Sequence, residues 1–359
     1  MRAFDVPPLA VLDLLDGGAP APPSPFFVMS ESAVQGLVAA WRAGLPNTKL
    51  LYAVKANRDG RLLQLLHDDR VEFALQSKAD GDAVMRAGIP NGVCHLMRPE
   101  VLRYVAERGA VGSITTPNLA SLSNTGAVLS LLRVRLLASS SAIRFAYRSG
   151  VPVSRLHAML AAMKASGTVP DGLAFHQGSQ IQDADEWQRL AAVLGEVGDV
   201  FPPNGVVNLG GGRPVAYGTG ERDWRETLDH VCRLKQQGAF GDHPLWVEPG
   251  RALVAEAGWL VSTVLATSRT ASTRVVELDV RIEDSLPERF YGIHHPVVWT
   301  TGQQGRIPTR LRGRDGVDLG LQTLPQNLKA GDRVVFGGAG AYTTALVPGR
   351  RCPPIVWSE

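Results

Sequence analysis

The sequence has few cysteines and lacks both a long apolar run and a block of like charge. Its three cysteines, Cys94, Cys232 and Cys352, lie far apart and do not have the spacing of metal ligands. This usage predicts no disulfide framework and no metal site, and it is typical of a reducing, cytoplasmic compartment. No apolar run reaches the roughly 18 residues that would predict a membrane-spanning helix. Acidic residues interrupt the N-terminal region, so no signal peptide is expected.

Charge and composition exclude some partners. The 359 residues include 37 basic and 34 acidic side chains, a net charge of +3, and no basic stretch indicates nucleic-acid binding. With 45% hydrophobic and 20% charged residues, the composition is ordinary for a globular protein. The length suits a large barrel with a second domain rather than one small core.

Residues 31–255 alternate short apolar runs with amphipathic stretches, which predicts a parallel (β/α)8 TIM barrel; a doubly wound sheet is the alternative. The expected strands are residues 49–54, 71–75, 93–97, 111–115, 131–137, 172–176, 205–209 and 244–248. The expected helices are residues 31–43, 60–68, 78–87, 99–108, 154–166, 184–198 and 222–237.

The pattern changes after residue 255. Five apolar, strand-like runs follow one another without long helices between them, which predicts a C-terminal β-sandwich or β-barrel domain over residues 256–359. The expected strands are residues 261–265, 273–280, 297–301, 306–311 and 333–336. Residues 1–30, with a short strand at 26–29, are expected to contribute to this β domain.

Residues 52–57 (Tyr-Ala-Val-Lys-Ala-Asn) end a predicted barrel strand with a lysine. Burial lowers the pKa of an ammonium group, and a neutral amine is a nucleophile that can form a Schiff base with an aldehyde, including that of pyridoxal phosphate. An ordinary strand-end lysine that reaches solvent fits this segment equally well. The remaining motifs must therefore decide whether Lys55 is a reactive amine or an ordinary strand-end lysine.

Other predicted strands end in polar or glycine-rich segments, where a barrel carries its reactive groups. His176 precedes Gly178 and Ser179, and residues 210–212 are three consecutive glycines, which allow backbone amides to approach a phosphate closely. Each segment also has a bland interpretation: a histidine that satisfies turn backbone, or an ordinary strand-to-loop turn.

Two further segments add charge and an aromatic hydroxyl. Glu248 can pair with a protonated ring nitrogen, and Arg251 can bind phosphate, although a surface Glu–Arg pair has the same sequence. Near the end, residues 337–342 place Tyr342 after a loop of small residues, where a tyrosine often simply packs.

In order, these segments resemble the fold-type III pyridoxal-phosphate decarboxylases, which include ornithine and diaminopimelate decarboxylases; alanine racemase is a more distant relative with the same fold. The resemblance extends from Pro25 to about Tyr342. It rests on Tyr-Ala-Val-Lys-Ala-Asn, His-x-Gly-Ser-Gln, Gly-Gly-Gly, Glu-Pro-Gly-Arg and Gly-Ala-Tyr as a set.

The resemblance implies a role for each cofactor-site residue. Lys55 would bind pyridoxal 5'-phosphate as a Schiff base, His176 would stack on its ring, and Glu248 would pair with the pyridine nitrogen. Arg133 matches a family arginine near the cofactor. The implied phosphate ligands are Ser179, Gly210, Gly211, Gly212, Arg251 and Tyr342.

The substrate side departs from the family pattern. Arg314 stands where the family usually has the cysteine that reprotonates the substrate, and an arginine that stays charged is a poor acid but a good carboxylate ligand. Asp315 matches the acid that meets a distal amine. Ala74 replaces a family aspartate. The resemblance thus gives Lys55, His176, Arg314 and Asp315 as catalytic candidates. The substrate-binding candidates are Asp279, Arg281, Arg289, Arg314 and Asp315.

These features predict PLP-dependent decarboxylation of an amino acid or an amino-acid conjugate, in specialised (siderophore- or antibiotic-type) or polyamine-related biosynthesis. The missing acid leaves open a racemase or a decarboxylation-coupled transaminating enzyme, and a non-catalytic, decarboxylase-like regulator is a further alternative. The resemblance also implies a homodimer, in which Arg314 and Asp315 reach the Lys55 of the other subunit.

Overall fold

A computed structural model describes residues 4–7, 9–15, 21–89, 94–96, 113–116, 129–136, 141–144, 150–270, 273–302, 304–343 and 352–359. The chain divides into two compact units. One unit comprises residues 38–215 and 222–253, and the other comprises residues 1–37, 216–221 and 254–359. The expected helix at 99–108 lies outside the described residues.

The first unit is a closed parallel barrel. Neighbouring strands follow the order β5-β4-β3-β2-β12-β11-β9-β6, and a pairing between β5 and β6 closes the ring. Its strands are β2 (Thr48–Ala53), β3 (Glu72–Leu75), β4 (Cys94–Leu96), β5 (Ser113–Thr116), β6 (Leu129–Arg135), β9 (Gly172–Phe175), β11 (Val206–Asn208) and β12 (Leu245–Val247). The predicted barrel is confirmed, and the doubly wound alternative is wrong because the sheet has closed on itself.

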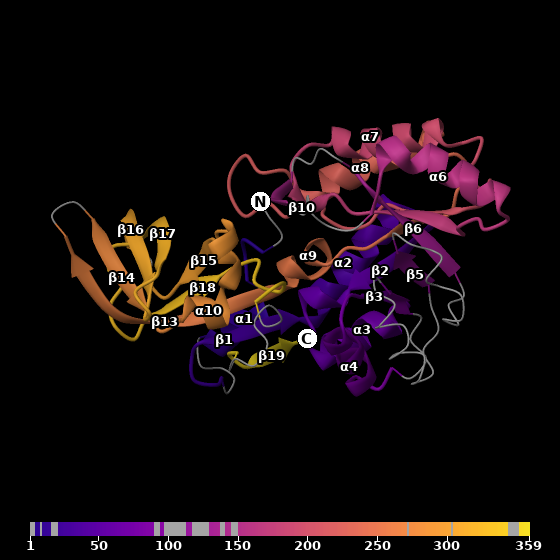
Figure 1. Cartoon of the computed structure of the whole chain (residues 1–359). Helices are drawn as coiled ribbons and strands as arrows, with labels where there is room; N and C mark the ends of the chain where they lie inside the picture. The colour runs from indigo at the N-terminus through magenta and orange to yellow at the C-terminus, as the bar shows by residue number, and fades with distance from the viewer. Residues whose placement is uncertain are drawn as a thin grey trace. The chain divides into compact units, whose positions relative to one another are not determined.

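Helices follow the barrel strands, as Figure 1 shows for α6, α7 and α8. Local signals start several of them: Asp59 accepts the N–H of Leu62 at the start of α3, and Asp223 accepts that of Arg225 at the start of α8. The helices are α2 (Glu31–Gly44), α3 (Gly60–Asp68), α4 (Lys78–Arg86), α6 (Val153–Ala165), α7 (Asp185–Glu196), α8 (Trp224–Gln236) and α9 (Arg251–Val254). Shorter elements are the 3-10 turn η1 (Val54–Ala56) and the strands β7 (Ser141–Arg144), β8 (Val151–Pro152) and β10 (Gly178–Ile181).

The second unit contains an eight-stranded sheet whose longest strand is β13 (Gly258–Arg269). The first part of β13 pairs with β1 and β18, and the last part pairs with β14, so this strand joins two halves of the sheet. The other strands are β1 (Phe26–Ser30), β14 (Arg274–Leu278), β15 (Val297–Thr300), β16 (Arg306–Gly313), β17 (Asp318–Pro325), β18 (Arg333–Phe336) and β19 (Ile355–Ser358). Its short helical pieces are α1 (Leu9–Leu15), η3 (Ala255–Ala257), α10 (Ile282–Ser285) and η4 (Pro287–Tyr291).

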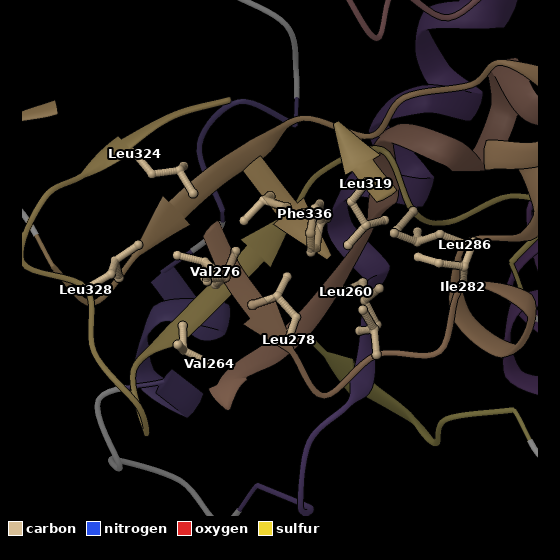
Figure 2. Packing of buried hydrophobic residues seen from close by; sticks show 14 of the residues in the cluster. Leu260, Val264, Val276, Leu278, Ile282, Leu286, Leu319, Leu324, Leu328 and Phe336 are labelled. Atoms are coloured by element: carbon tan, nitrogen blue, oxygen red, sulfur yellow. The ribbon is translucent and has the colours of Figure 1, made fainter. Parts of the chain in front are cut away.

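Residues distant in the sequence form the core of this sheet unit. Figure 2 shows Leu260 of β13, Val276 and Leu278 of β14, and Phe336 of β18 in one apolar cluster, which Ile282 of α10 extends. β1 runs antiparallel to β13 and parallel to β19, so the N-terminal strand lies inside the sheet rather than on the barrel. Two strands, β17 and β19, were not expected from the sequence.

No helix among the described residues combines the length and the apolar character needed to cross a membrane. Within the same residues, no group of three or more His, Cys, Asp and Glu side chains could hold a metal ion.

An ion pair between a buried aspartate and a half-buried arginine supports the barrel beside the Lys55 segment. Asp80 is fully buried and accepts Nε of Arg58 at 2.7 Å. Its other carboxylate oxygen accepts the N–H groups of Gln76 at 2.8 Å and Ser77 at 2.9 Å, which caps α4. Because one carboxylate binds both a cation and two backbone donors, its removal takes away three hydrogen bonds at once.

We expect Asp80→Ala to lower the free energy of unfolding by about 1–3 kcal/mol, because it removes a fully buried carboxylate that accepts hydrogen bonds from Arg58 and from two backbone N–H groups. Urea denaturation followed by circular dichroism measures the change. Asp68→Asn, at an exposed position on α3, is the control and should change the stability by less than about 0.5 kcal/mol. A similar small change for Asp80→Ala would contradict the structural role of the ion pair.

Candidate active site

The carboxyl ends of four barrel strands bring together the residues that the motifs singled out. Lys55 lies in η1 directly after β2, and His176 follows β9. Gly210 comes two residues after β11, and Glu248 follows β12. Since all these strands are parallel, the four residues lie at the same end of the barrel.

Backbone contacts fix the segment around Lys55. The N–H of Ala53 donates to the carbonyl of Pro249 at 3.0 Å, which ties the end of β2 to the segment that follows Glu248. The hydroxyl of Tyr52 donates to the carbonyl of Asn57 at 3.0 Å and so links the two ends of the turn. Lys55 itself is half-buried between two buried neighbours, Val54 and Ala56. The lysine is thus presented on a fixed turn.

The three glycines pack so closely against their neighbours that side chains cannot fit. A Cβ on Gly210 would lie 2.1 Å from the carbonyl oxygen of Phe175, and one on Gly211 would lie 2.5 Å from that of Glu248. A Cβ on Gly212 would lie 2.5 Å from the carbonyl oxygen of Gly178. Gly210 and Gly212 also have φ values of 67° and 92°, which disfavour other residues. The loop is a backbone cradle of the kind that accepts an anion.

Glu248 is held by a neighbour that sequence reasoning missed. Nδ2 of Asn208 donates to Oε1 of Glu248 at 2.7 Å, while its Oδ1 accepts the N–H of Gly210 at 2.9 Å. The N–H of Glu248 in turn donates to the carbonyl of Gly210 at 2.9 Å. One amide side chain therefore couples the carboxylate to the glycine loop. The signal for Asn208 in the sequence was a polar residue at the end of a buried strand.

The histidine and serine segment lies against the same loop. The position of a Cβ on Gly211 is 3.7 Å from Cε1 of His176, so the imidazole borders the cradle. Ser179 is in β10. Ile181, two residues later in the same strand, donates its N–H to the carbonyl of Gly212 at 2.9 Å. Gln180 exchanges two hydrogen bonds of 2.8 Å with the backbone of Val215. These contacts hold both sides of the loop.

Three arginines are buried among the residues of the barrel unit that the structure describes. Arg133, in β6, is 7% exposed and is in register with Ala174 of β9. Arg251 begins α9 and is 4% exposed. Arg213 directly follows the glycine run, and sequence reasoning did not single it out. Burial lowers the pKa of Arg213 to about 9, so its guanidinium remains charged at neutral pH.

The predicted substrate residues lie in the sheet unit, where Asp279 and Arg281 make local contacts. The carboxylate of Asp279 accepts the hydroxyl of Ser262 at 2.8 Å and the N–H of Thr263 at 3.0 Å. Arg281 forms an ion pair of 3.4 Å with Asp284, one helical turn on. These contacts give both residues a role within the sheet unit, and their predicted contact with substrate stays a prediction.

Arg289 belongs to a polar group at the edge of the sheet. Its Nε donates to the carbonyl of Asp318 at 3.1 Å, and its guanidinium contacts the ring of His294. Partial burial and the positive charge of Arg289 lower the pKa of His294. Arg310 pairs with the carboxylate of Asp318. This group is cationic overall.

Arg314 and Asp315 form the turn between β16 and β17. Both are exposed, and the backbone N–H of Arg314 donates to the carbonyl of Val280 at 3.0 Å. Asp315 accepts the N–H of Ile282 at 2.9 Å and that of Val317 at 3.2 Å, so its carboxylate also shapes the turn. Tyr342, partly buried, has a left-handed φ of 56° in the loop after β18.

One end of the closed (β/α)8 barrel presents a lysine, a triple-glycine cradle and a fixed carboxylate. This combination is typical of a barrel that holds an anionic aldehyde cofactor. The cradle leaves room for backbone contact alone, which suits a phosphate. Glu248 offers a carboxylate to a protonated ring nitrogen, and Lys55 offers an amine. The residues present thus fit pyridoxal 5'-phosphate.

The chain belongs to the pyridoxal-dependent decarboxylases. Residues 31–255 match the family model described as the pyridoxal binding domain of these enzymes. The chain is therefore a pyridoxal-phosphate-dependent amino-acid decarboxylase, which confirms the resemblance and the cofactor predicted from the motifs. Membership of this family of enzymes disfavours the non-catalytic, decarboxylase-like regulator that the sequence left open.

Similar proteins differ in the substrates that their names state. A diaminopimelate decarboxylase of Actinosynnema pretiosum is 26% identical, and the match covers 96% of this chain and 87% of the relative. A lysine/ornithine decarboxylase of Selenomonas ruminantium is 24% identical over 90% of this chain and 86% of its own. The arginine decarboxylase of Paramecium bursaria Chlorella virus, solved with agmatine, matches with a TM-score of 0.80 at 19% identity and covers 97% and 100% of the two chains. This last likeness shows the fold.

We expect Gly211→Ala to weaken the binding of pyridoxal 5'-phosphate. The new Cβ would meet the carbonyl oxygen of Glu248 at 2.5 Å, and the shift needed to relieve this costs about 1–3 kcal/mol in the loop. Equilibrium titration of the apoprotein with the cofactor measures the loss.

Gly195→Ala is the matched control, because nothing lies within 4 Å of a Cβ at this position in α7. It should leave cofactor affinity unchanged and stabilise the helix by about 0.5–1 kcal/mol. Equal affinities of Gly211→Ala and wild type would show that the close approach at residue 211 does not shape the binding site.

Proposed function

We propose that Lys55 is the residue that binds the cofactor covalently and that the groups around it hold the cofactor in a fixed orientation. The observation that carries this proposal is the hydrogen-bonded loop of Gly210, Glu248 and Asn208 at the same barrel end as Lys55. Bound pyridoxal phosphate supplies the electron sink for cleavage of the bond between the substrate's Cα and its carboxylate.

Each surrounding residue has a proposed task. Glu248 keeps the ring nitrogen protonated, with its carboxylate oriented by Asn208, and His176 packs on the ring from the edge of the cradle. The proposed phosphate ligands are the amides of residues 210–212 together with Ser179, Arg251 and Tyr342, and Arg133 lies near the cofactor. The glycine contacts and the burial of Arg133 and Arg251 support these assignments.

The substrate is proposed to be an amino acid or an amino-acid conjugate with an anionic or carbonyl group that Arg314 binds. The exposed position of Arg314 on a turn supports this, since a charged group there can reach a second subunit or a substrate without rearrangement of the sheet. Asp315 would meet a distal amine, and Asp279, Arg281 and Arg289 complete the proposed substrate side. Such a substrate fits specialised biosynthesis of the siderophore or antibiotic type better than the formation of simple polyamines.

A homodimer with shared active sites accompanies this proposal. Arg314 and Asp315 of one subunit would face Lys55 of the partner, as the resemblance implies. The proposal explains why the exposed turn between β16 and β17 carries two charged residues. Light scattering of the active enzyme tests it, and activity of a strictly monomeric form would contradict it.

A second candidate reaction follows from the same substitution. With an arginine in place of a cysteine, the protonation of Cα has no assigned donor, so a racemase or a decarboxylation-coupled transaminating enzyme is the alternative. Product analysis in heavy water distinguishes them. A plain decarboxylase gives an amine with one deuterium at Cα, a racemase retains the carboxylate, and a transaminating enzyme gives a carbonyl compound.

We expect Lys55→Ala to abolish covalent capture of the cofactor and decarboxylation together. Wild-type protein incubated with pyridoxal 5'-phosphate and borohydride should carry the reduced cofactor on the peptide that contains Lys55, as mass spectrometry can show. Lys78→Ala, at an exposed lysine of α4, should behave as wild type. Labelling of another lysine, or unchanged turnover by Lys55→Ala, would contradict the assignment.

We expect Arg314→Ala to change substrate preference rather than cofactor binding. Loss of a charge-assisted contact costs about 1.5–3 kcal/mol, or roughly tenfold or more in kcat/KM for the anionic substrate. The assay compares diaminopimelate, lysine, ornithine, arginine and their N-acyl or N-succinyl conjugates. Arg312→Ala, exposed near the end of β16 and just before this turn, is the control. An unchanged profile for Arg314→Ala would refute the proposed contact.

A further inference from the structure

Arg213 is a buried cation that directly follows the glycine loop. It is 2% exposed, and its guanidinium lies between the indole rings of Trp187, at 4.3 Å from the ring centroid, and Trp41, at 5.3 Å. Trp41 in turn stacks on Trp224 with ring centroids 5.3 Å apart. These tryptophans come from α7, α2 and α8, so three helices contribute to the surroundings of this side chain.

The two indole rings favour a cation at this position, but they do not satisfy all of its hydrogen-bond donors. Among the residues that the structure describes, Nε and Nη2 of Arg213 have no hydrogen-bond partner, and burial is the cause of its lowered pKa. A buried guanidinium with two unsatisfied donors is costly, and an apolar side chain of similar volume would fill the space between the indoles at a lower cost. A costly group that the fold does not need suggests a function.

The hydrogen bond that Arg213 does make is directed at the cradle. Its Nη1 donates to the carbonyl of Gly210 at 3.0 Å, and the same oxygen accepts the N–H of Glu248 at 2.9 Å. In a planar trans peptide, the carbonyl of Gly210 and the N–H of Gly211 point in opposite directions. The N–H of Gly211 is therefore directed away from Arg213, and a cation on the carbonyl side polarises it toward an anion.

We propose that Arg213 is a positioning residue of the anion site: through the carbonyl of Gly210 it orients and polarises the N–H of Gly211 for the cofactor phosphate. The inference rests on the proposed function, in which the glycine loop binds that phosphate. Arg213 does not touch the phosphate itself, and its effect is confined to ligands that carry one.

The test compares two ligands that differ only in the phosphate. Dissociation constants of pyridoxal 5'-phosphate and of pyridoxal are measured by titration of the apoprotein, and inorganic phosphate is used as a competitor. Arg213→Met, which removes the charge and the donor at similar volume, should weaken the binding of pyridoxal 5'-phosphate about tenfold or more. It should leave the affinity for pyridoxal unchanged and reduce competition by inorganic phosphate.

Two further variants and a stability measurement separate this role from a structural one. Arg213→Lys, which keeps the charge, should recover part of the phosphate-dependent affinity, and Arg213→Gln serves the same comparison if the methionine variant is insoluble. Thermal unfolding of Arg213→Met apoprotein should occur at the same or a higher temperature than that of wild type. Arg225→Met, an exposed arginine 4.2 Å from the ring of Trp224, is the matched control and should change neither affinity.

Equal losses for both ligands, or no loss for either, would overturn the role of Arg213. If wild-type protein binds pyridoxal 5'-phosphate no more tightly than pyridoxal, the phosphate site of the proposed function fails instead, whatever the variants do. The two failures are thus distinguished by the wild-type measurement.

Discussion

The carbonyl oxygen of Gly210 is the acceptor on which the arrangement of the barrel end depends. It receives the N–H of Glu248 and the guanidinium of Arg213, while the N–H of the same residue is bound by Asn208. No side chain can be added at Gly210, because a Cβ would lie 2.1 Å from the carbonyl oxygen of Phe175. The backbone N–H and carbonyl of this one residue therefore link two strand ends and a loop.

The barrel and the strand-end positions could be predicted because the signals are local. Each barrel strand is a short apolar run, and parallel closure forces whatever follows the strands to one face. A lysine after β2, a histidine after β9 and a glutamate after β12 were thus predictable as neighbours, although they lie far apart in the sequence. Figure 1 shows β2, β3 and β6 among the strands that build this unit.

The roles of Asn208 and Arg213 could not be predicted, because they depend on distant partners, although the position of Asn208 at a strand end was visible in the sequence. The partner of Asn208 lies 40 residues away, and the indoles beside Arg213 belong to two helices, α2 and α7, that come earlier in the chain. In the sheet unit, β17 was missed because its glycine, aspartate and glutamine weaken a strand pattern that its pairing with β16 overrides. The inclusion of residues 216–221 in the sheet unit likewise has no local signal.

These differences suggest where substrate preference can change. Asn208, Gly210 and Glu248 constrain one another, so a substitution at any of them disturbs the others. Arg314 contributes its backbone to the sheet through the carbonyl of Val280, while its side chain is exposed. A different side chain at residue 314 therefore costs little stability. The side chain at such a position can therefore change with the substrate, whereas Asn208, Gly210 and Glu248 are constrained by the fold.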